Sequence, residues 1–207
     1  MTLAVLTAEV LGRLKLRAQD ATRFKITDSL NEAQRWILTH ADSRLIKNAV
    51  RSEKFNLKAS IGSMQLPSEF VRVLPHGAWM DYFAEISDTN PGRPVRILFD
   101  GEVHEGSNIY SVPSIDFPQI SFGIEGGILI RPVPAATRAN GLRLLYVQML
   151  PTISSTQECL LDVSLENCTI YKATSLSAMI ENYSPTMAES FGKMALDELG
   201  IKPKISQ

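Results

Sequence analysis

The stretch TDSLNEAQRWIL, residues 27–38, decides how the rest of the chain is interpreted. Apolar side chains recur around it at intervals of three and four residues, which is the spacing of one face of an α-helix. Asp28, Glu32 and Arg35 fall on the opposite face, where Glu32 and Arg35 form a favourable charge pair. The pattern predicts an amphipathic helix that has Thr27 as its N-cap.

A further helix is predicted before this one. In residues 2–19, leucine and valine recur at helical spacing, and either Thr2 or Thr7 can cap the first turn. Because the connection between the two helices is short, we expect them to pack as antiparallel neighbours.

Helical spacing returns near the end of the chain. Ser164 can cap one helix, and Ser184 followed by Pro185 is typical of the start of another. Gly200 is placed to end this last helix in the left-handed conformation. Lys172 falls within the apolar stripe, where it either extends its ammonium along the helix surface or contributes a charge to a subunit contact. The predicted apolar stripes of these two helices consist of Leu165, Cys168, Leu176, Met179, Ile180, Tyr183, Met187, Phe191, Met194 and Ala195.

Between the two pairs of helices the hydrophobic period becomes that of strands. Residues 55–61 alternate between apolar and polar side chains, which predicts a half-buried strand. Gly62 and Ser63 would then turn the chain into a returning arm that runs from Met64 to Pro67. The sequence therefore favours a hairpin at this point.

Less regular segments surround this hairpin. Residues 42–50 fit either a helical turn or a loop, and prolines and glycines divide residues 84–118 into short pieces. A second hairpin is predicted from residue 122 to 131, with its turn at Gly126 and Gly127. Other strands are predicted in residues 71–74, 78–83, 95–99 and 142–149.

The order of these elements predicts an α+β protein. We expect helices from both ends of the chain to form one four-helix bundle, with an antiparallel β region inserted between them. The expected helical bundle domain comprises residues 1–49 and 150–200, the inserted β domain residues 50–149, and a C-terminal tail residues 201–207.

Composition restricts the function classes. The chain has 207 residues and a net charge of -1, with 21 Lys and Arg against 22 Asp and Glu, so no electrostatic footprint for nucleic acid is predicted. No apolar run is long enough for a membrane span, and the N-terminus lacks the features of a signal peptide, so we expect a protein that is cytosolic or assembles from the cytosol. Cys159 and Cys168 are interpreted as free thiols in a reducing compartment.

Motifs for catalysis or cofactor binding are not found, and no enzyme activity, cofactor or metal is predicted. The sequence contains no phosphate-binding P-loop, no nucleophile elbow and no zinc-protease helix motif. His40, His76 and His104 share no ligand spacing. The acidic cluster of Asp100, Glu102 and Glu105 fits either a cation loop or, as we favour, a polar turn.

Four separated stretches resemble a single family, the head-to-tail adaptor proteins of bacteriophages. Residues 30–34, LNEAQ, resemble the L/I-N-x-A-Q helix of that family. Residues 62–70, GSMQLPSEF, are similar to its G-x-x-x-L-P-x-D/E-F turn, and residues 128–134, ILIRPVP, to its I-x-I-x-P-x-P strand. Residues 142–146 followed by Pro151 match its L-x-L-x-Y…P strand. The length suits the adaptors of short-tailed phages, including those called tail tubular protein A.

This resemblance implies a structural virion protein. Adaptors of this kind form a ring, usually of twelve identical subunits, that binds the portal protein, extends the DNA channel and docks the tail or nozzle protein. Genomic DNA would pass through the lumen without sequence-specific contact, and no membrane is involved. The expected location is the neck of the virion, between capsid and tail, after assembly in the host cytoplasm.

The contact surfaces of such a ring can be assigned to two sets of residues. We expect the subunit interface to include Asp28, Glu32, Arg35 and Lys172. A tail beyond the terminating glycine would bind the portal or tail protein with Ile201, Lys202, Pro203, Lys204 and Ile205.

Two alternatives remain at this stage. The chain could be another tail completion or neck protein, which would also form oligomers. It could instead be a hydrolase whose site is assembled within the β domain from Asp100, His104 and Glu105.

Overall fold

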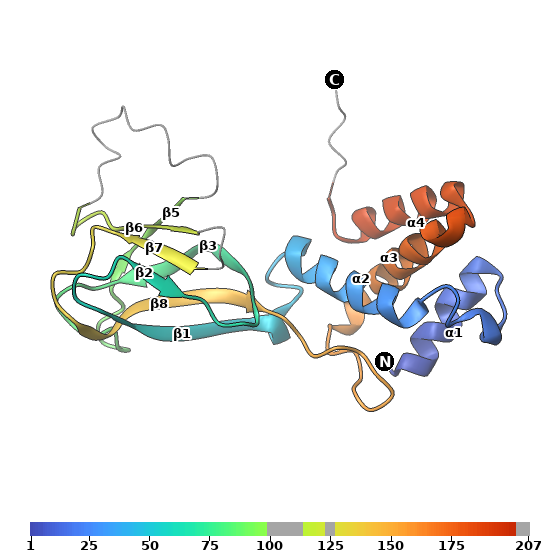
Figure 1. The fold of residues 1–207 in the computed structure, drawn as a ribbon, viewed down its shortest axis with the longest axis horizontal. Helices are drawn as coiled ribbons and strands as arrows, with labels where there is room; N and C mark the ends of the chain where they lie inside the picture. Colours follow the sequence, from blue (N-terminus) through green and yellow to red (C-terminus); the bar gives the residue numbers. More distant parts are fainter. Residues whose placement is uncertain (99–113, 123–126, 202–207) are drawn as a thin grey trace, which may run out of the picture. The chain divides into compact units, whose positions relative to one another are not determined.

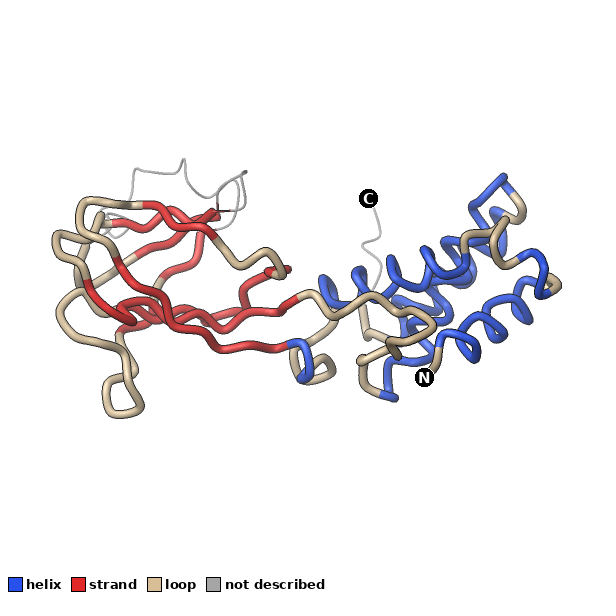
Figure 2. Tube along the Cα trace, turned by 60° about the horizontal axis from the view of Figure 1, so that its bottom comes forward, coloured by secondary structure: helices blue, strands red, loops and turns tan. Residues whose placement is uncertain are grey.

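The computed structural model describes residues 1–98, 114–122 and 127–201 (Figure 1). The chain divides into two compact units, one formed by Met1–Ala49 with Met149–Gln207 and the other by Val50–Gln148. Within the described residues, Figure 2 shows helices almost entirely in the first unit and strands in the second. The prediction of an α+β protein with two N-terminal and two C-terminal helices is confirmed.

The helical unit is arranged around its third helix. It contains α1 (Leu3–Leu14), α2 (Ile26–His40), α3 (Glu166–Met179) and α4 (Pro185–Glu198). α3 packs against each of the other three helices, and α1 also contacts α2 (Figure 1). The core of this unit consists of Leu6, Val10, Leu11, Leu14, Phe24, Ile26, Leu30, Ala33, Ile153, Ile170, Ala173, Ala178 and Ala188.

The two N-terminal helices begin and end at positions that differ in part from those predicted. Thr2 caps α1 by accepting a hydrogen bond from the Val5 N–H at 3.5 Å. α1 ends at Leu14 because Lys15 adopts a left-handed backbone conformation, so the prediction of one helix to residue 19 is wrong. The predicted N-cap of α2, Thr27, is also wrong, because Lys25 occupies that position and Thr27 lies in the first turn.

The predicted apolar stripe of α3 is only partly correct. Cys168 is buried as expected, but Met179 is 60% exposed. The predicted cap is wrong as well, since Asp162, rather than Ser164, caps the short 3-10 turn Val163–Leu165 that leads into α3. A helix with neighbours on several sides buries most of its circumference, which favours small side chains over a single apolar stripe. The buried residues of α3 are accordingly Cys168, Thr169, Ile170, Ala173, Thr174, Ser175, Ser177 and Ala178.

The last helix starts and stops as its sequence predicts. The Ser184 hydroxyl accepts a hydrogen bond from the Met187 N–H, and Pro185 occupies the first turn of α4. At the other end Gly200 has a φ of 68°, and the N–H of the following Ile201 bonds the Leu196 carbonyl at 3.0 Å. The predicted stripe is partly correct, because Ala195 is buried as expected, but Met194 is 43% exposed and only small residues form the buried face that meets α3. These residues are Ala188 and Ala195.

The β unit contains two four-stranded sheets within the described residues. One has the order β1 (Val50–Leu57), β8 (Arg138–Gln148), β3 (Phe70–Met80) and β4 (Arg93–Pro94). The other has the order β2 (Ser63–Gln65), β7 (Gly127–Arg131), β6 (Gln119–Phe122) and β5 (Arg96–Leu98). The prediction of an antiparallel region needs correction, because β5 pairs with β6 in the parallel sense.

The hairpin predicted from the alternation of residues 55–61 is wrong. β1 begins earlier, at Val50, and pairs with β8, whereas the returning arm becomes β2 and pairs with β7 in the other sheet. Ser60, with a φ of 60°, lies in the turn between the two strands. The antiparallel β6–β7 pair is present as predicted, and its turn residues 123–126 lie outside the described part.

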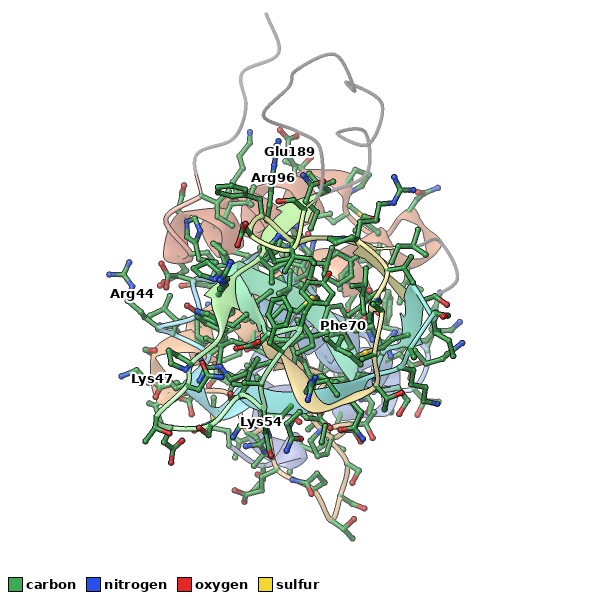
Figure 3. All side chains as sticks on the ribbon, turned by 90° about the vertical axis from the view of Figure 1, so that its left-hand side faces the viewer. Arg44, Lys47, Lys54, Phe70, Arg96 and Glu189 are labelled. Atoms are coloured by element: carbon green, nitrogen blue, oxygen red, sulfur yellow. The ribbon has the colours of Figure 1, made fainter. Side chains whose placement is uncertain are left out.

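Apolar side chains of both sheets form the core of the β unit. Phe70, labelled in Figure 3, lies against Phe122 and Tyr146, with ring centroids 5.6 and 5.4 Å away. The fully packed members of this core are Leu57, Ala78, Met80, Val95, Ile120, Ile128, Ile130, Leu142, Leu144 and Tyr146.

Candidate interaction surfaces

The residues considered for catalysis do not form a described site. His40 belongs to the helical unit and His76 to the β unit. His104 and the acidic cluster of Asp100, Glu102 and Glu105 lie outside the described residues. Among residues 1–98, 114–122 and 127–201, no group of three or more His, Cys, Asp or Glu side chains is arranged to hold a metal ion.

No helix among the described residues combines the length and the apolar character that crossing a bilayer requires.

The polar face of α2 lies in solvent. Asp28, Glu32 and Arg35 are all exposed, and the Arg35 guanidinium is 3.4 Å from the Glu32 carboxylate, as their spacing predicts. Exposed pairs of this kind contribute at most about 1 kcal/mol to folding. These side chains are therefore accessible to a partner at little cost to the fold.

Lys172 lies half-buried on α3 and faces α2. Its Nζ atom is 4.7 Å from the centroid of the Trp36 ring, and the Trp36 ring stacks on His40. Burial lowers the pKa of Lys172, while the nearby Glu32 charge acts in the opposite direction. Lys172 therefore contacts the same helix as the proposed interface residues, and its ammonium already interacts with the Trp36 ring.

Two amide side chains of α2 form a contact that the sequence did not predict. The Asn31 Nδ2 donates to the Ile153 carbonyl at 3.2 Å, and the Asn31 Oδ1 accepts from the Ile153 N–H at 2.7 Å. The Gln34 Nε2 donates to the Pro151 carbonyl at 2.9 Å. We call this set of bonds the amide clamp. It holds the segment by which the chain re-enters the helical unit after β8.

A sequence signal for the amide clamp exists in retrospect. Asn31 and Gln34 are three positions apart and border the apolar stripe of α2, so their amides can reach the same neighbouring segment. Gln34 is only 2% exposed, and a buried amide requires hydrogen-bond partners. Hydrophobic periodicity alone assigns such polar residues to the surface, so it does not indicate their buried hydrogen bonds.

The two cysteines are free thiols. Cys159 lies near the amide clamp, with its Sγ 3.8 Å from the Gln34 Oε1, and Cys168 lies in the contact between α3 and α4, 3.5 Å from the Ala195 carbonyl. Burial raises the pKa of both thiols, that of Cys168 to about 12. Neither group is therefore poised as a thiolate nucleophile near neutral pH.

The strand motifs of the β unit contact one another. The Ile130 N–H bonds the Gly62 carbonyl at 2.8 Å, within the pairing of β2 with β7. The Ser60 N–H bonds the Pro134 carbonyl, also at 2.8 Å. A Cβ atom added at Gly62 would lie 2.9 Å from the Cγ2 of Val133 and 3.3 Å from the Ile130 carbonyl oxygen, so the two segments approach closely here.

An apolar groove opens between the outer strands of the two sheets. It has a volume of about 740 Å³ and is lined by residues 55–57 of β1, Lys58, Ile61, β2 and residues 127–130 of β7. β1 and β2 are edge strands in the described sheets. Leu129 is 42% exposed there, although it lies in the middle of β7. We call this surface the β1–β2 groove.

The predicted partner-binding tail is described only at its first residue. Ile201 completes the C-terminal cap of α4, because its N–H bonds the Leu196 carbonyl. Lys202, Pro203, Lys204 and Ile205 lie outside the described residues. The candidate tail therefore begins at residue 202.

Comparison with known proteins adds no relative. No protein-family model and no curated protein matches the sequence.

Proposed function

We propose that the chain is the head-to-tail adaptor of a bacteriophage, one subunit of a ring that binds the portal protein and docks the tail. The proposal includes the finer fold prediction, in which the four helices act as one bundle and the β unit is an insertion that presents binding surfaces. It also includes the location in the neck of the virion and the passage of DNA through the ring.

One observation carries this proposal: the separate stretches that resemble the adaptor family contact one another in pairs. Residues 30–34 supply the amide clamp, and the clamp holds Pro151, which belongs to the fourth stretch. Residues 62–70 and 128–134 meet in the β2–β7 pair. These contacts are those expected if the four stretches are parts of one adaptor-like fold, and in this way they support the proposal.

The charge distribution is compatible with the same role. With a net charge of -1 the chain has no strong field of either sign, so DNA can pass its surface without being retained. The exposed face of α2 and the β1–β2 groove provide polar and apolar surfaces for assembly.

The test is a co-assembly experiment with a candidate portal protein. The intact chain and a variant that ends at Ile201 are each mixed with portal, and the particles are imaged. Ending the chain at this residue preserves the bond from the Ile201 N–H to Leu196, so α4 keeps its cap. We expect rings on portal with the intact chain and no attachment with the shortened one.

A matched control separates the tail from general surface charge. Lys193 is an exposed lysine on α4 that pairs with Glu189, and Lys193→Ala should leave portal binding unchanged. Unchanged co-assembly of the shortened chain would exclude the tail as the portal contact. Binding to a tail component but never to portal would identify a tail completion protein instead.

A further inference from the structure

Residues 81–92 form a loop that presents a phenylalanine to solvent. Phe83 is 65% exposed, and its backbone is fixed by Asp81, whose Oδ1 accepts the N–H groups of Phe83 and Ala84 at 2.8 and 2.9 Å. The Asp81 Oδ2 accepts from the Asn90 Nδ2 at 3.0 Å. Burial alone would raise the pKa of Asp81, but these hydrogen bonds lower it below its usual value. The carboxylate therefore stays ionised and holds the loop from both sides.

The base of this loop is equally well anchored. Ile86 is fully buried, and its N–H bonds the Asn140 carbonyl at 3.1 Å. Gly92 closes the loop in the left-handed conformation, with a φ of 74°, directly against Ile86. A phenylalanine on so ordered a support loses little conformational entropy on binding, which is a property of interface anchor residues. We call residues 81–92 the Phe83 loop.

The β1–β2 groove has the complementary chemistry. Its walls include the apolar side chains of Ile61 and Leu129, both partly open to solvent. A phenyl ring buries about 150–250 Å² and needs an apolar recess of this kind. The volume of about 740 Å³ accommodates the ring together with the residues beside it.

The charges of the two surfaces are opposite in sign. The Phe83 loop contains Asp81, Glu85 and Asp88 but no lysine or arginine. Lys58 lines the groove, and Lys54 and Arg131 are exposed beside it on β1 and β7 (Lys54 is labelled in Figure 3). Glu53 also lies on β1, where it accepts the Tyr146 hydroxyl at 2.7 Å, and its single negative charge only partly offsets these three cations. Approach of the loop to the groove is therefore electrostatically favourable.

The two surfaces belong to different strands of the same unit. The groove lies at the outer edges of β1 and β2, whereas the Phe83 loop follows the end of β3, two strands away in the order β1-β8-β3-β4. Phe83 remains exposed, so the loop does not fill the groove of its own chain. A contact between them must join two copies, and because the two surfaces differ, it is heterologous and can close into a ring.

We propose that the Phe83 loop of one copy docks into the β1–β2 groove of the next copy. The contact deepens the adaptor function proposed above and rests on it, because it names the surfaces by which ring subunits bind each other. A stable pairwise interface buries about 800 Å² on each partner, more than one phenylalanine supplies. Each contact is therefore weak alone, and the ring gains stability because every subunit makes two contacts.

Sedimentation of the full chain over a range of concentrations tests the docking surface. The unaltered protein should associate as its concentration rises, and Phe83→Ala should weaken this association roughly thirtyfold, which corresponds to about 2 kcal/mol. Phe117, at 74% exposure, provides a matched control, because Phe117→Ala removes an equally accessible ring outside both surfaces. Association of Phe83→Ala equal to that of the unaltered chain would overturn the proposal.

A mixing experiment tests the head-to-tail geometry. Leu129→Asp places a charge in the groove at an exposed position, so it should abolish self-association without unfolding the β unit. A mixture of Phe83→Ala and Leu129→Asp retains one functional loop and one functional groove. We expect this mixture to form dimers and nothing larger. Failure to form dimers contradicts the proposal, as does an unaltered protein that stays monomeric at every concentration reached.

These outcomes are distinct from those of the portal experiment. Rings that require Phe83 but do not bind portal would support the proposed docking surface and contradict the adaptor function. If the Phe83→Ala variant forms rings that bind portal as well as the unaltered chain does, the adaptor function is supported and the proposed docking surface is contradicted.

Discussion

The helical unit and the β unit are stabilised by different kinds of contact. In the helical unit, α3 packs through its own small side chains, and the amide clamp joins backbone and side-chain groups that are 117 to 122 residues apart. In the β unit, long strands bring backbones close together over an aliphatic and aromatic core. We conclude that the first unit depends on a few specific hydrogen bonds, and the second on how closely its strands can approach.

Glycine substitutions should give the largest difference between the units. At Gly77 in β3, an added Cβ would lie 2.5 Å from the Leu145 carbonyl oxygen and 2.8 Å from that of Leu74. Gly77→Ala should therefore destabilise the β unit by about 3 kcal/mol. Gly12 in α1 has nothing within 4 Å of an added Cβ, so Gly12→Ala should stabilise the helical unit by about 1 kcal/mol.

Each unit contains one of the two tryptophans, which allows the two effects to be measured separately. Denaturant unfolding is followed by Trp79 fluorescence in a Trp36→Phe background and by Trp36 fluorescence in a Trp79→Phe background. Equal responses of both probes to Gly77→Ala would show that the units unfold as one, and the comparison would then fail.

The amide clamp should give the next largest effect. Asn31→Ala removes both bonds to Ile153, whose buried N–H and carbonyl would be left without these partners. We expect a loss of about 2 kcal/mol in the unfolding free energy reported by Trp36. Asn31→Asp keeps the acceptor for the Ile153 N–H and loses the donor. Its unfolding free energy should therefore lie between those of Asn31→Ala and the unaltered chain. An alanine variant as stable as the unaltered chain would contradict the structural role of the clamp.

Alkaline pH should begin to destabilise the two units at different pH values. Burial raises the pKa of Tyr82 and Tyr146 from 10.0 to about 12, and Glu53 adds to the effect at Tyr146. The unfolded chain loses these protons first, so their stabilisation is complete below pH 10.0 and disappears toward pH 12. In the helical unit burial raises the pKa of Cys168 from 9.0 to about 12. The stability contributed by the protonated thiol therefore begins to fall near pH 9.0.

The measurement is a pH series of denaturant unfolding with the two tryptophan probes. Cys168→Ala should reduce the early alkaline loss at Trp36, to which Cys159 also contributes, and Tyr82→Phe should reduce the later loss at Trp79. A tyrosinate absorbance titration should in parallel show midpoints near 12 for Tyr82 and Tyr146.

The smallest effect is expected at the exposed pair of α2. Glu32→Ala should change the unfolding free energy of the helical unit by no more than about 0.5 kcal/mol, because both partners are solvent-exposed. A double-mutant cycle with Arg35→Ala measures the pair energy. A coupling energy of several kcal/mol between Glu32 and Arg35 would show that this exposed pair contributes as much as buried contacts do. One difference between the two units would then disappear.

The sequence predicted the helical unit better than the β unit, for a physical reason. Ser184, Pro185 and Gly200 act within one turn of their own helix, so their effect can be read locally. The partner of β1 lies near the other end of the unit, in β8, and no property of residues 50–57 identifies it. The alternation beyond residue 57 led instead to a hairpin that does not form.

The interaction surfaces show the same limit. Asp28, Glu32 and Arg35 were found because helical period places them on one face. The β1–β2 groove combines strands of two sheets, and Phe83 becomes an anchor only because Asp81 and Asn90 fix its loop. Such features depend on tertiary contacts, which the period of a single segment does not contain.

The pairing of β1 with β8 has a consequence for synthesis of the chain. Val50 lies opposite Val147, so the first and last strands of the β unit bring the two ends of the insertion together. The β unit is continuous in sequence and can fold while the C-terminal helices are still being made. Once it has folded, α3 and α4 meet α1 and α2 without closing a loose loop of about a hundred residues, which would otherwise cost roughly 4 kcal/mol. The inserted unit thereby acts as an internal template for a helical core whose two halves are translated far apart in time.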